Sequence, residues 1–123
     1  MIPIHPAQAL FIYDRLARAC RARVHPALPD PLVTAIRAAR RVRGSALRHA
    51  AAVAAEVLAR RPFPWGNEPA ALLLALVALG LNDVVTRVSS RQADAAVRRW
   101  SRRPPPRVEI EAWLRRRTLT GSA

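Results

Sequence analysis

The stretch "AALLLALVALGL" at residues 70–81 decides the fold class of this chain. Wound as a helix, it is apolar on all sides, which is typical of an element enclosed by other elements. It is about a dozen residues long, whereas a membrane-spanning helix needs about 20. The loop "RPFPWGNEP" precedes it and offers Asn67 as an N-cap. We therefore expect a central buried helix over residues 68–79.

Apolar residues recur at helical spacing through the rest of the chain, between prolines and capping residues. The N-caps that we expect are Asp30, Ser45 and either Ser89 or Ser90. The further helices predicted by this pattern cover residues 6–24, 31–43, 46–61, 81–88, 90–102 and 108–117. The expected fold class is all-α, a compact bundle of about six or seven short helices around the central helix 68–79.

A chain of 123 residues is long enough to bury one hydrophobic core, so we expect a single helical domain over residues 1–123. A division into two sub-bundles, 1–61 and 68–117, joined by the Pro-rich loop 62–67, stays open. The single cysteine, Cys20, is expected to be a small buried residue, and it excludes an intrachain disulfide. The N-terminus lacks the pattern of a secretion signal, so we expect a cytoplasmic protein.

The charge of the chain is strongly unbalanced, with 21 basic residues against 8 acidic ones and a net charge of +13. Every basic residue is arginine, which a GC-rich coding sequence would also produce. Codon bias does not explain the excess of cations over anions. An excess of this size favours a polyanionic partner, with nucleic acid ahead of an acidic membrane.

The stretch "RRWSRRPPPR" at residues 98–107 concentrates this charge on the predicted helix 90–102. Trp100 projects to the apolar side of that helix, and Asp94 is its one acid. The guanidinium group suits bidentate contact with phosphate, so we predict that the arginine face binds nucleic acid. A merely solvated charged face is the alternative. The candidate arginines here are Arg91, Arg98 and Arg102, flanked by Arg99 and Arg103.

Further candidates lie on other predicted helices. Arg37 and Arg41 form a second patch, and Arg15 and Arg18 form a third. Among the tryptophans, Trp100 and Trp113 share faces with apolar residues and are expected in the core. Trp65 lies in a loop between Pro64 and Gly66, which makes it the candidate for stacking on a base.

The sequence offers no pattern of catalytic or metal-binding residues. His5, His25 and His49 are scattered, and none has a cysteine or acid at metal-ligand spacing. The four glycines form no phosphate-binding loop, and Glu109 and Glu111 are expected to pair with neighbouring arginines. We expect no enzyme activity, cofactor, metal or small-molecule substrate.

A compact, arginine-rich, all-helical chain of this size resembles the small helical subunit of CRISPR surveillance complexes. The resemblance rests on the helix pattern, on Arg91, Arg98 and Arg102, and on Arg37 with Arg41. It implies a non-catalytic subunit of a ribonucleoprotein assembly, which binds the nucleic-acid backbone without sequence preference. It also implies packing against larger subunits and against copies of itself. Whether the nucleic acid is RNA or DNA stays open.

Two other functions stay open beside this one. The segment "NDVVTRVSSRQADAAVRRW" at residues 82–100 has the outline of a helix-turn-helix, without the glycine often found in its turn. It would make the protein a dimeric DNA-binding regulator. Alternatively, the basic faces belong to a protein-interaction module that binds an acidic protein.

Overall fold

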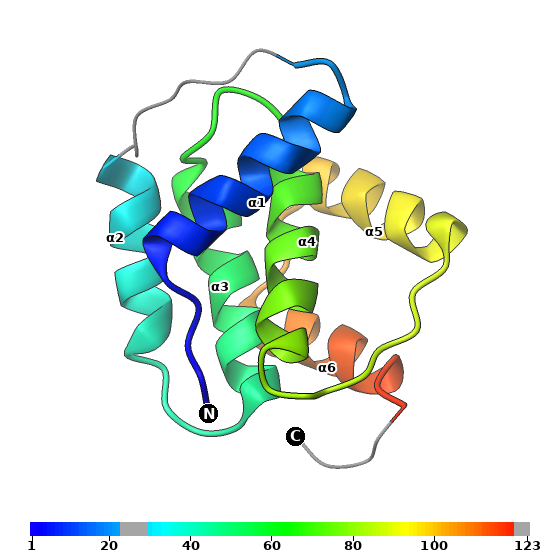
Figure 1. The fold of residues 1–123 in the computed structure, drawn as a ribbon. Helices are drawn as coiled ribbons and strands as arrows, with labels where there is room; N and C mark the ends of the chain where they lie inside the picture. Colours follow the sequence, from blue (N-terminus) through cyan, green and yellow to red (C-terminus); the bar gives the residue numbers. More distant parts are fainter. Residues whose placement is uncertain (23–29, 120–123) are drawn as a thin grey trace.

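The computed structural model describes residues 1–22 and 30–119, and these residues form six helices (Figure 1). The all-α prediction is confirmed. In chain order the helices are α1 (Pro6–Ala19), α2 (Asp30–Arg40), α3 (Ala46–Arg60), α4 (Asn67–Gly80), α5 (Ser90–Arg102) and α6 (Arg107–Arg116).

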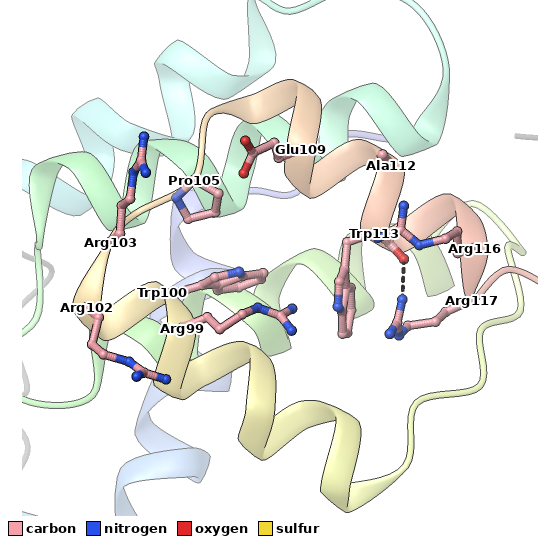
Figure 2. A pocket seen from close by; sticks show the side chains of 10 residues that line it. All are labelled: Arg99, Trp100, Arg102, Arg103, Pro105, Glu109, Ala112, Trp113, Arg116 and Arg117. Atoms are coloured by element: carbon pink, nitrogen blue, oxygen red, sulfur yellow. Dashed lines mark hydrogen bonds between the residues drawn. The ribbon is translucent and has the colours of Figure 1, made fainter.

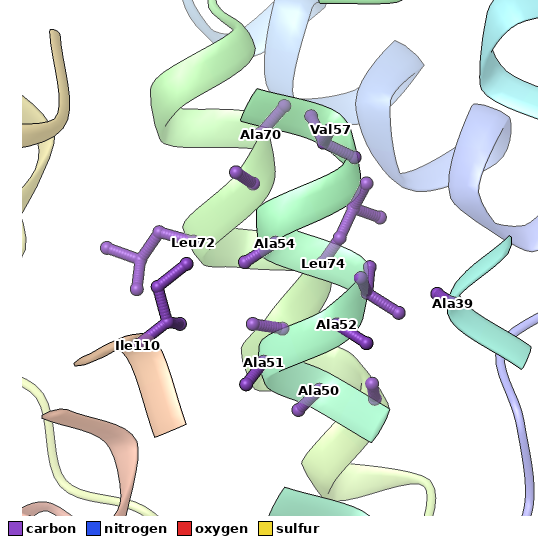
Figure 3. Packing of buried hydrophobic residues seen from close by; sticks show 14 of the residues in the cluster. Ala39, Ala50, Ala51, Ala52, Ala54, Val57, Ala70, Leu72, Leu74 and Ile110 are labelled. Carbon is purple, nitrogen blue, oxygen red and sulfur yellow. The ribbon is translucent and has the colours of Figure 1, made fainter. Parts of the chain in front are cut away.

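Helices α3 and α4 form an antiparallel pair at the centre of the bundle (Figure 1). Both helices bury several alanines, among them Ala54 and Ala70 (Figure 3), and such small side chains allow helices to pack closely. Helices α2 and α6 pack against α3, while α1 and α5 pack against α4. The buried apolar residues form one cluster from Ile4 to Leu114, so residues 1–61 and 68–117 contribute to a common core.

The central helix α4 is not enclosed on every side. Leu73, Leu76 and Val77 are only half-buried, although the sequence pattern predicts an apolar helix surrounded by others. Two apolar hollows open along this side of α4, with volumes of about 450 and 420 Å³, and both are also lined by residues of α1. The bundle therefore exposes an apolar surface along α1 and α4.

Serine side chains begin α3 and α5, as predicted. The Ser45 hydroxyl oxygen accepts a hydrogen bond from the Arg48 backbone N–H at 3.2 Å. Ser89 forms a reciprocal pair with Gln92, in which each side-chain oxygen accepts from the other residue's backbone N–H, at 3.1 and 3.0 Å. Such caps satisfy N–H groups that have no partner inside the helix.

The start of α4 differs from the prediction. Its N-cap is Gly66, which has a φ of +71°, and Asn67 is already helical. The Asn67 side chain instead bonds both the N–H and the carbonyl oxygen of Phe63, at 3.0 and 2.9 Å. The prediction of Asn67 as the N-cap was wrong, because its side-chain amide bonds the backbone of Phe63 in the preceding loop.

The first two helices end earlier than predicted. Helix α1 ends at Ala19, because the backbone of Arg21 turns into the left-handed region at a φ of +59° and the Ala22 N–H bonds to Ala17. Cys20 lies at this helix end and is exposed, so the prediction of a buried cysteine was wrong. Helix α2 already includes Asp30, the expected N-cap, and ends at Arg40. The last residues of the helix predicted over 6–24, 23 and 24, lie outside the described residues.

The predicted short helix over residues 81–88 was wrong. Asp83 has a φ of +59°, which ends the helical path after α4, and β-branched residues follow. Residues 81–83 form a turn, and residues 85–87 pair with the chain after α6. Arg87 donates its N–H to the Arg117 carbonyl oxygen at 2.9 Å, and Leu119 donates to Val85 at 2.8 Å. This pairing fixes the position of the end of α6.

Candidate functional site

A hollow of about 570 Å³ lies between the C-terminal part of α5 and helix α6 (Figure 2). Arginines line it from both helices, together with the rings of two tryptophans. The lining residues are Arg99, Trp100, Arg102, Arg103, Pro105, Glu109, Ala112, Trp113, Arg116 and Arg117.

The two tryptophans give the hollow a rigid apolar lining. Trp100 and Trp113 are 4% and 5% exposed, which confirms that both belong to the core. Their ring centroids are 6.1 Å apart at an interplanar angle of 68°, the edge-to-face arrangement that aromatic pairs favour. Because each ring anchors its own helix, the pair fixes how α5 and α6 present their arginines.

Arg117 is held most firmly of the arginines in the hollow. Its guanidinium carbon lies 3.9 Å from the centroid of the Trp113 ring, and its Nη1 donates to the Trp113 carbonyl oxygen at 3.0 Å. Within the described part of the chain, its buried Nε has no hydrogen-bond partner. Burial lowers the pKa of the Arg117 guanidinium, and the charges of Arg116 and Arg99 lower it further.

The positive charge in the hollow is uncompensated, unlike that at several other arginines. Arg107 and Arg115 pair with Glu111, and Arg61 pairs with Glu68 at 3.1 Å. Among residues 1–22 and 30–119, no carboxylate lies within 4.0 Å of the charged nitrogens of the five arginines in the hollow. Glu109 is the one acid in the lining. The hollow is therefore a concentrated positive site suited to an anion.

Three of the arginines predicted on α5 meet in this hollow, and two do not. Arg99, Arg102 and Arg103 line it. Arg98 lies at the edge of the apolar hollow between α4 and α5 instead. Arg91 is in the first turn of α5, about 16 Å along the helix from Arg102. The predicted face is thus spread along α5, and only its C-terminal end joins α6.

The other predicted arginines lie away from this hollow. Arg37 is on α2 and Arg41 follows its end, on the opposite side of the bundle from α5 (Figure 1). On α1, Arg18 bonds Asp14 at 3.0 Å, and the Arg15 guanidinium lies 5.9 Å from the centroid of the Phe11 ring. These patches and the hollow do not form one continuous site.

Trp65 is exposed, as predicted, but it is not part of the hollow. Its side chain is 39% exposed, and its backbone carbonyl oxygen accepts a hydrogen bond from the Tyr13 hydroxyl at 2.7 Å. The Tyr13 ring stacks on Phe63 with centroids 3.7 Å apart. The structure thus explains how the loop is held to α1, and a stacking role for Trp65 stays a prediction.

Sequence reasoning missed Arg116 and Arg117. The signal was the run of arginines at residues 115–117, directly after the core residues Trp113 and Leu114. Its members separate in the structure, since Arg115 pairs with Glu111 while the next two line the hollow. The residue at which α6 ends determines which of these arginines line the hollow. The backbone hydrogen bond between Arg87 and Arg117 sets that end.

No protein-family model matches the chain, and no curated protein matches it. Within the described residues, none of the helices has the length and hydropathy needed to cross a membrane. The same residues contain no group of three or more His, Cys, Asp or Glu side chains placed to hold a metal ion.

Proposed function

We propose that this protein is a non-catalytic subunit of a larger assembly and that it binds the backbone of nucleic acid without sequence preference. The observation that carries the proposal is the hollow between α5 and α6, which five arginines line together with a single glutamate. Guanidinium groups bind phosphate through paired N–H donors.

The charge of the whole chain supports the same proposal. A net charge of +13 attracts a polyanion over long range and speeds its association. Arg91 and Arg98 extend the positive charge of α5 beyond the hollow, and a backbone lying along that helix would meet them. The contacts involve guanidinium groups and no defined set of base-reading side chains, so binding without sequence preference is expected.

An apolar surface supports a place in a larger assembly. Phe11 is 62% exposed and lines one of the two apolar hollows along α1 and α4. Large contiguous apolar patches on a protein surface mark contacts with other proteins or with membranes. Membership of a CRISPR effector, which the resemblance implies, stays a prediction. The helix-turn-helix interpretation needs a helix over residues 81–88, where a turn at 81–83 is followed by a non-helical segment.

The direct test is binding to random-sequence single-stranded DNA, double-stranded DNA and RNA over a series of salt concentrations. With about four to six phosphates engaged, log K should fall against log salt with a slope of about −3 to −5. A flat response to salt would contradict the proposal and favour an acidic protein as the partner. Strong preference for one duplex sequence would favour the regulator.

Two charge-matched triple variants localise the contact. Changing Arg99, Arg102 and Arg103 to Gln removes three charges from the hollow, and changing Arg37, Arg40 and Arg41 to Gln removes three from the α2 side. We expect the first variant to bind far more weakly than the second, with a salt slope smaller by up to about three. Equal losses would mean that only total charge matters.

A further inference from the structure

We infer that the hollow between α5 and α6 binds the phosphate monoester at the end of a nucleic-acid strand, an inference that rests on the proposed function. Continuous backbone then follows the exposed arginines of α5. The inference depends on three properties of the hollow: its net charge, the directions from which its donors come, and the partly buried guanidinium of Arg117.

The net charge of the hollow exceeds that of one internal phosphate. Five arginines and one glutamate line the hollow, and the C-terminal ends of α5 and α6 each add about half a negative charge. About three positive charges remain. An internal phosphodiester supplies one negative charge, whereas a terminal monoester carries about two at neutral pH. The monoester together with the first diester of the strand therefore balances the hollow.

The arrangement of donors also favours a terminal group. Arg99, Arg102 and Arg103 come from the α5 side, while Arg116 and Arg117 come from the end of α6 (Figure 2). An internal phosphodiester has two free oxygens, because the chain occupies the other two. A terminal phosphate has three strong acceptor oxygens and can be contacted from both sides at once. The volume of the hollow, about 570 Å³, lies within the range of ordinary ligand sites.

Arg117 provides the third property. Its guanidinium is fixed by Trp113, and its Nε is buried without a partner in the described part of the chain. In Figure 2 the Arg99 and Arg117 guanidinium groups lie on either side of the Trp113 ring. Both cations line one hollow, and like charges in one site repel each other unless an anion offsets them. A doubly charged phosphate removes that repulsion more completely than a singly charged one.

The test compares one short single-stranded DNA in four forms, each carrying an internal fluorescent label. The forms have a 5′-phosphate, a 3′-phosphate, hydroxyl groups at both ends, or a closed circle. We expect at least one phosphorylated form to bind about tenfold more tightly than the hydroxyl form, and the circle to bind like the hydroxyl form. The 5′ and 3′ arms identify which end is bound. Inorganic phosphate, at constant ionic strength, should weaken binding of the preferred phosphorylated form more than binding of the hydroxyl form.

Variants assign the preference to the hollow. Arg117→Gln and Arg99→Gln should each abolish the preference for a phosphorylated end, while Arg37→Gln on α2 should keep it. Thermal melting of each variant checks that it folds. If Arg117→Gln fails to fold, Arg99→Gln alone is sufficient for the test. Equal affinity for all four forms overturns this inference and leaves the proposed function standing. Absence of binding to every form overturns both.

Discussion

The guanidinium of Arg117 lies over the indole of Trp113, 3.9 Å from the ring centroid, and donates a hydrogen bond to the carbonyl oxygen of the same residue at 3.0 Å. Two contacts with one buried residue hold a cation at the edge of a hollow where Arg99 and Arg116 also lie. A cation–π contact contributes about 0.5–2 kcal/mol. This contribution offsets part of the repulsion among the three arginines, so the cluster persists without a carboxylate partner.

Replacing Arg117 by Met separates the packing role of this residue from its charge. The thioether side chain still covers Trp113, and the change removes a half-buried charge next to two others. We expect the free energy of unfolding to change by less than about 1 kcal/mol. Added phosphate should raise the melting temperature of the parent more than chloride of equal ionic strength, and this difference should shrink in the variant. An undiminished difference would place the phosphate outside the hollow.

Trp100→Ala should strongly destabilise the protein. The side chain is 4% exposed and packs edge-to-face with Trp113, so its removal leaves a large cavity between α5 and α6. A loss of about 3–5 kcal/mol is expected in urea unfolding. Trp65→Ala is the control. The Tyr13 hydroxyl donates to the backbone carbonyl oxygen of Trp65, which the change retains, so the stability of this variant should differ little from that of the parent. If Trp100→Ala melted like the parent, its assignment to the core would be wrong.

Ser89→Ala should weaken the start of α5. It removes the hydroxyl oxygen that accepts from the Gln92 N–H, which then has no partner inside the helix. A loss of about 1 kcal/mol is expected in chemical denaturation. Ser90→Ala provides the comparison, since Ser90 is the first helical residue and is exposed, and this change should have a much smaller effect. Equal effects would mean that the cap contributes nothing.

Stability should fall with pH below about 6.5 because of His49, which is fully buried. Its Nε2 accepts a hydrogen bond from the Ile4 N–H at 3.1 Å, so the ring must be neutral at that atom. Burial lowers the pKa of His49, and the charge of Arg40 lowers it further. The unfolded chain therefore binds more protons between the lowered pKa and about 6.5, and the free energy of unfolding decreases as pH falls through this window.

The variant His49→Gln tests this origin. The glutamine amide oxygen can accept from Ile4 but does not titrate in this range. Urea unfolding at a series of pH values should show a smaller decline for the variant than for the parent. Identical declines in the two proteins would assign the pH dependence to other groups.

The arginines predicted on α5 should differ in their contribution to binding. Changing Arg91, Arg98 and Arg102 together to Gln should leave melting unchanged or slightly improved, since all three are exposed. Binding should weaken and the salt slope should drop by up to about three. Because Arg102 lines the hollow while Arg91 is a helix length away, Arg102→Gln alone should cost more affinity than Arg91→Gln. The reverse order would move the contact to the start of α5.

Local signals were sufficient where one residue decides the outcome. The serines before α3 and α5 begin those helices, as predicted, because a hydroxyl at that position satisfies a backbone N–H whatever the rest of the chain does. The predicted helix at 81–88 failed because its course depends on contacts remote in sequence. Asn82 bonds to the Ile2 carbonyl oxygen at 2.9 Å, and Arg87 pairs with Arg117. The prediction that Cys20 is buried was wrong for a similar reason, since its burial depended on where α1 ends.

The sequence by itself determined that the protein is all-helical, that residues 70–79 lie at its centre, and that Trp100 and Trp113 are buried. Helical periodicity, caps and the apolar run carry this information within short stretches of chain. Only the tertiary structure decided which arginines share a site. Periodicity assigns each arginine to the outside of its own helix, and the packing of α5 and α6 through their tryptophans brings Arg99 and Arg117 to one hollow. The meeting of two helix ends depends on a core contact that neither helix encodes alone.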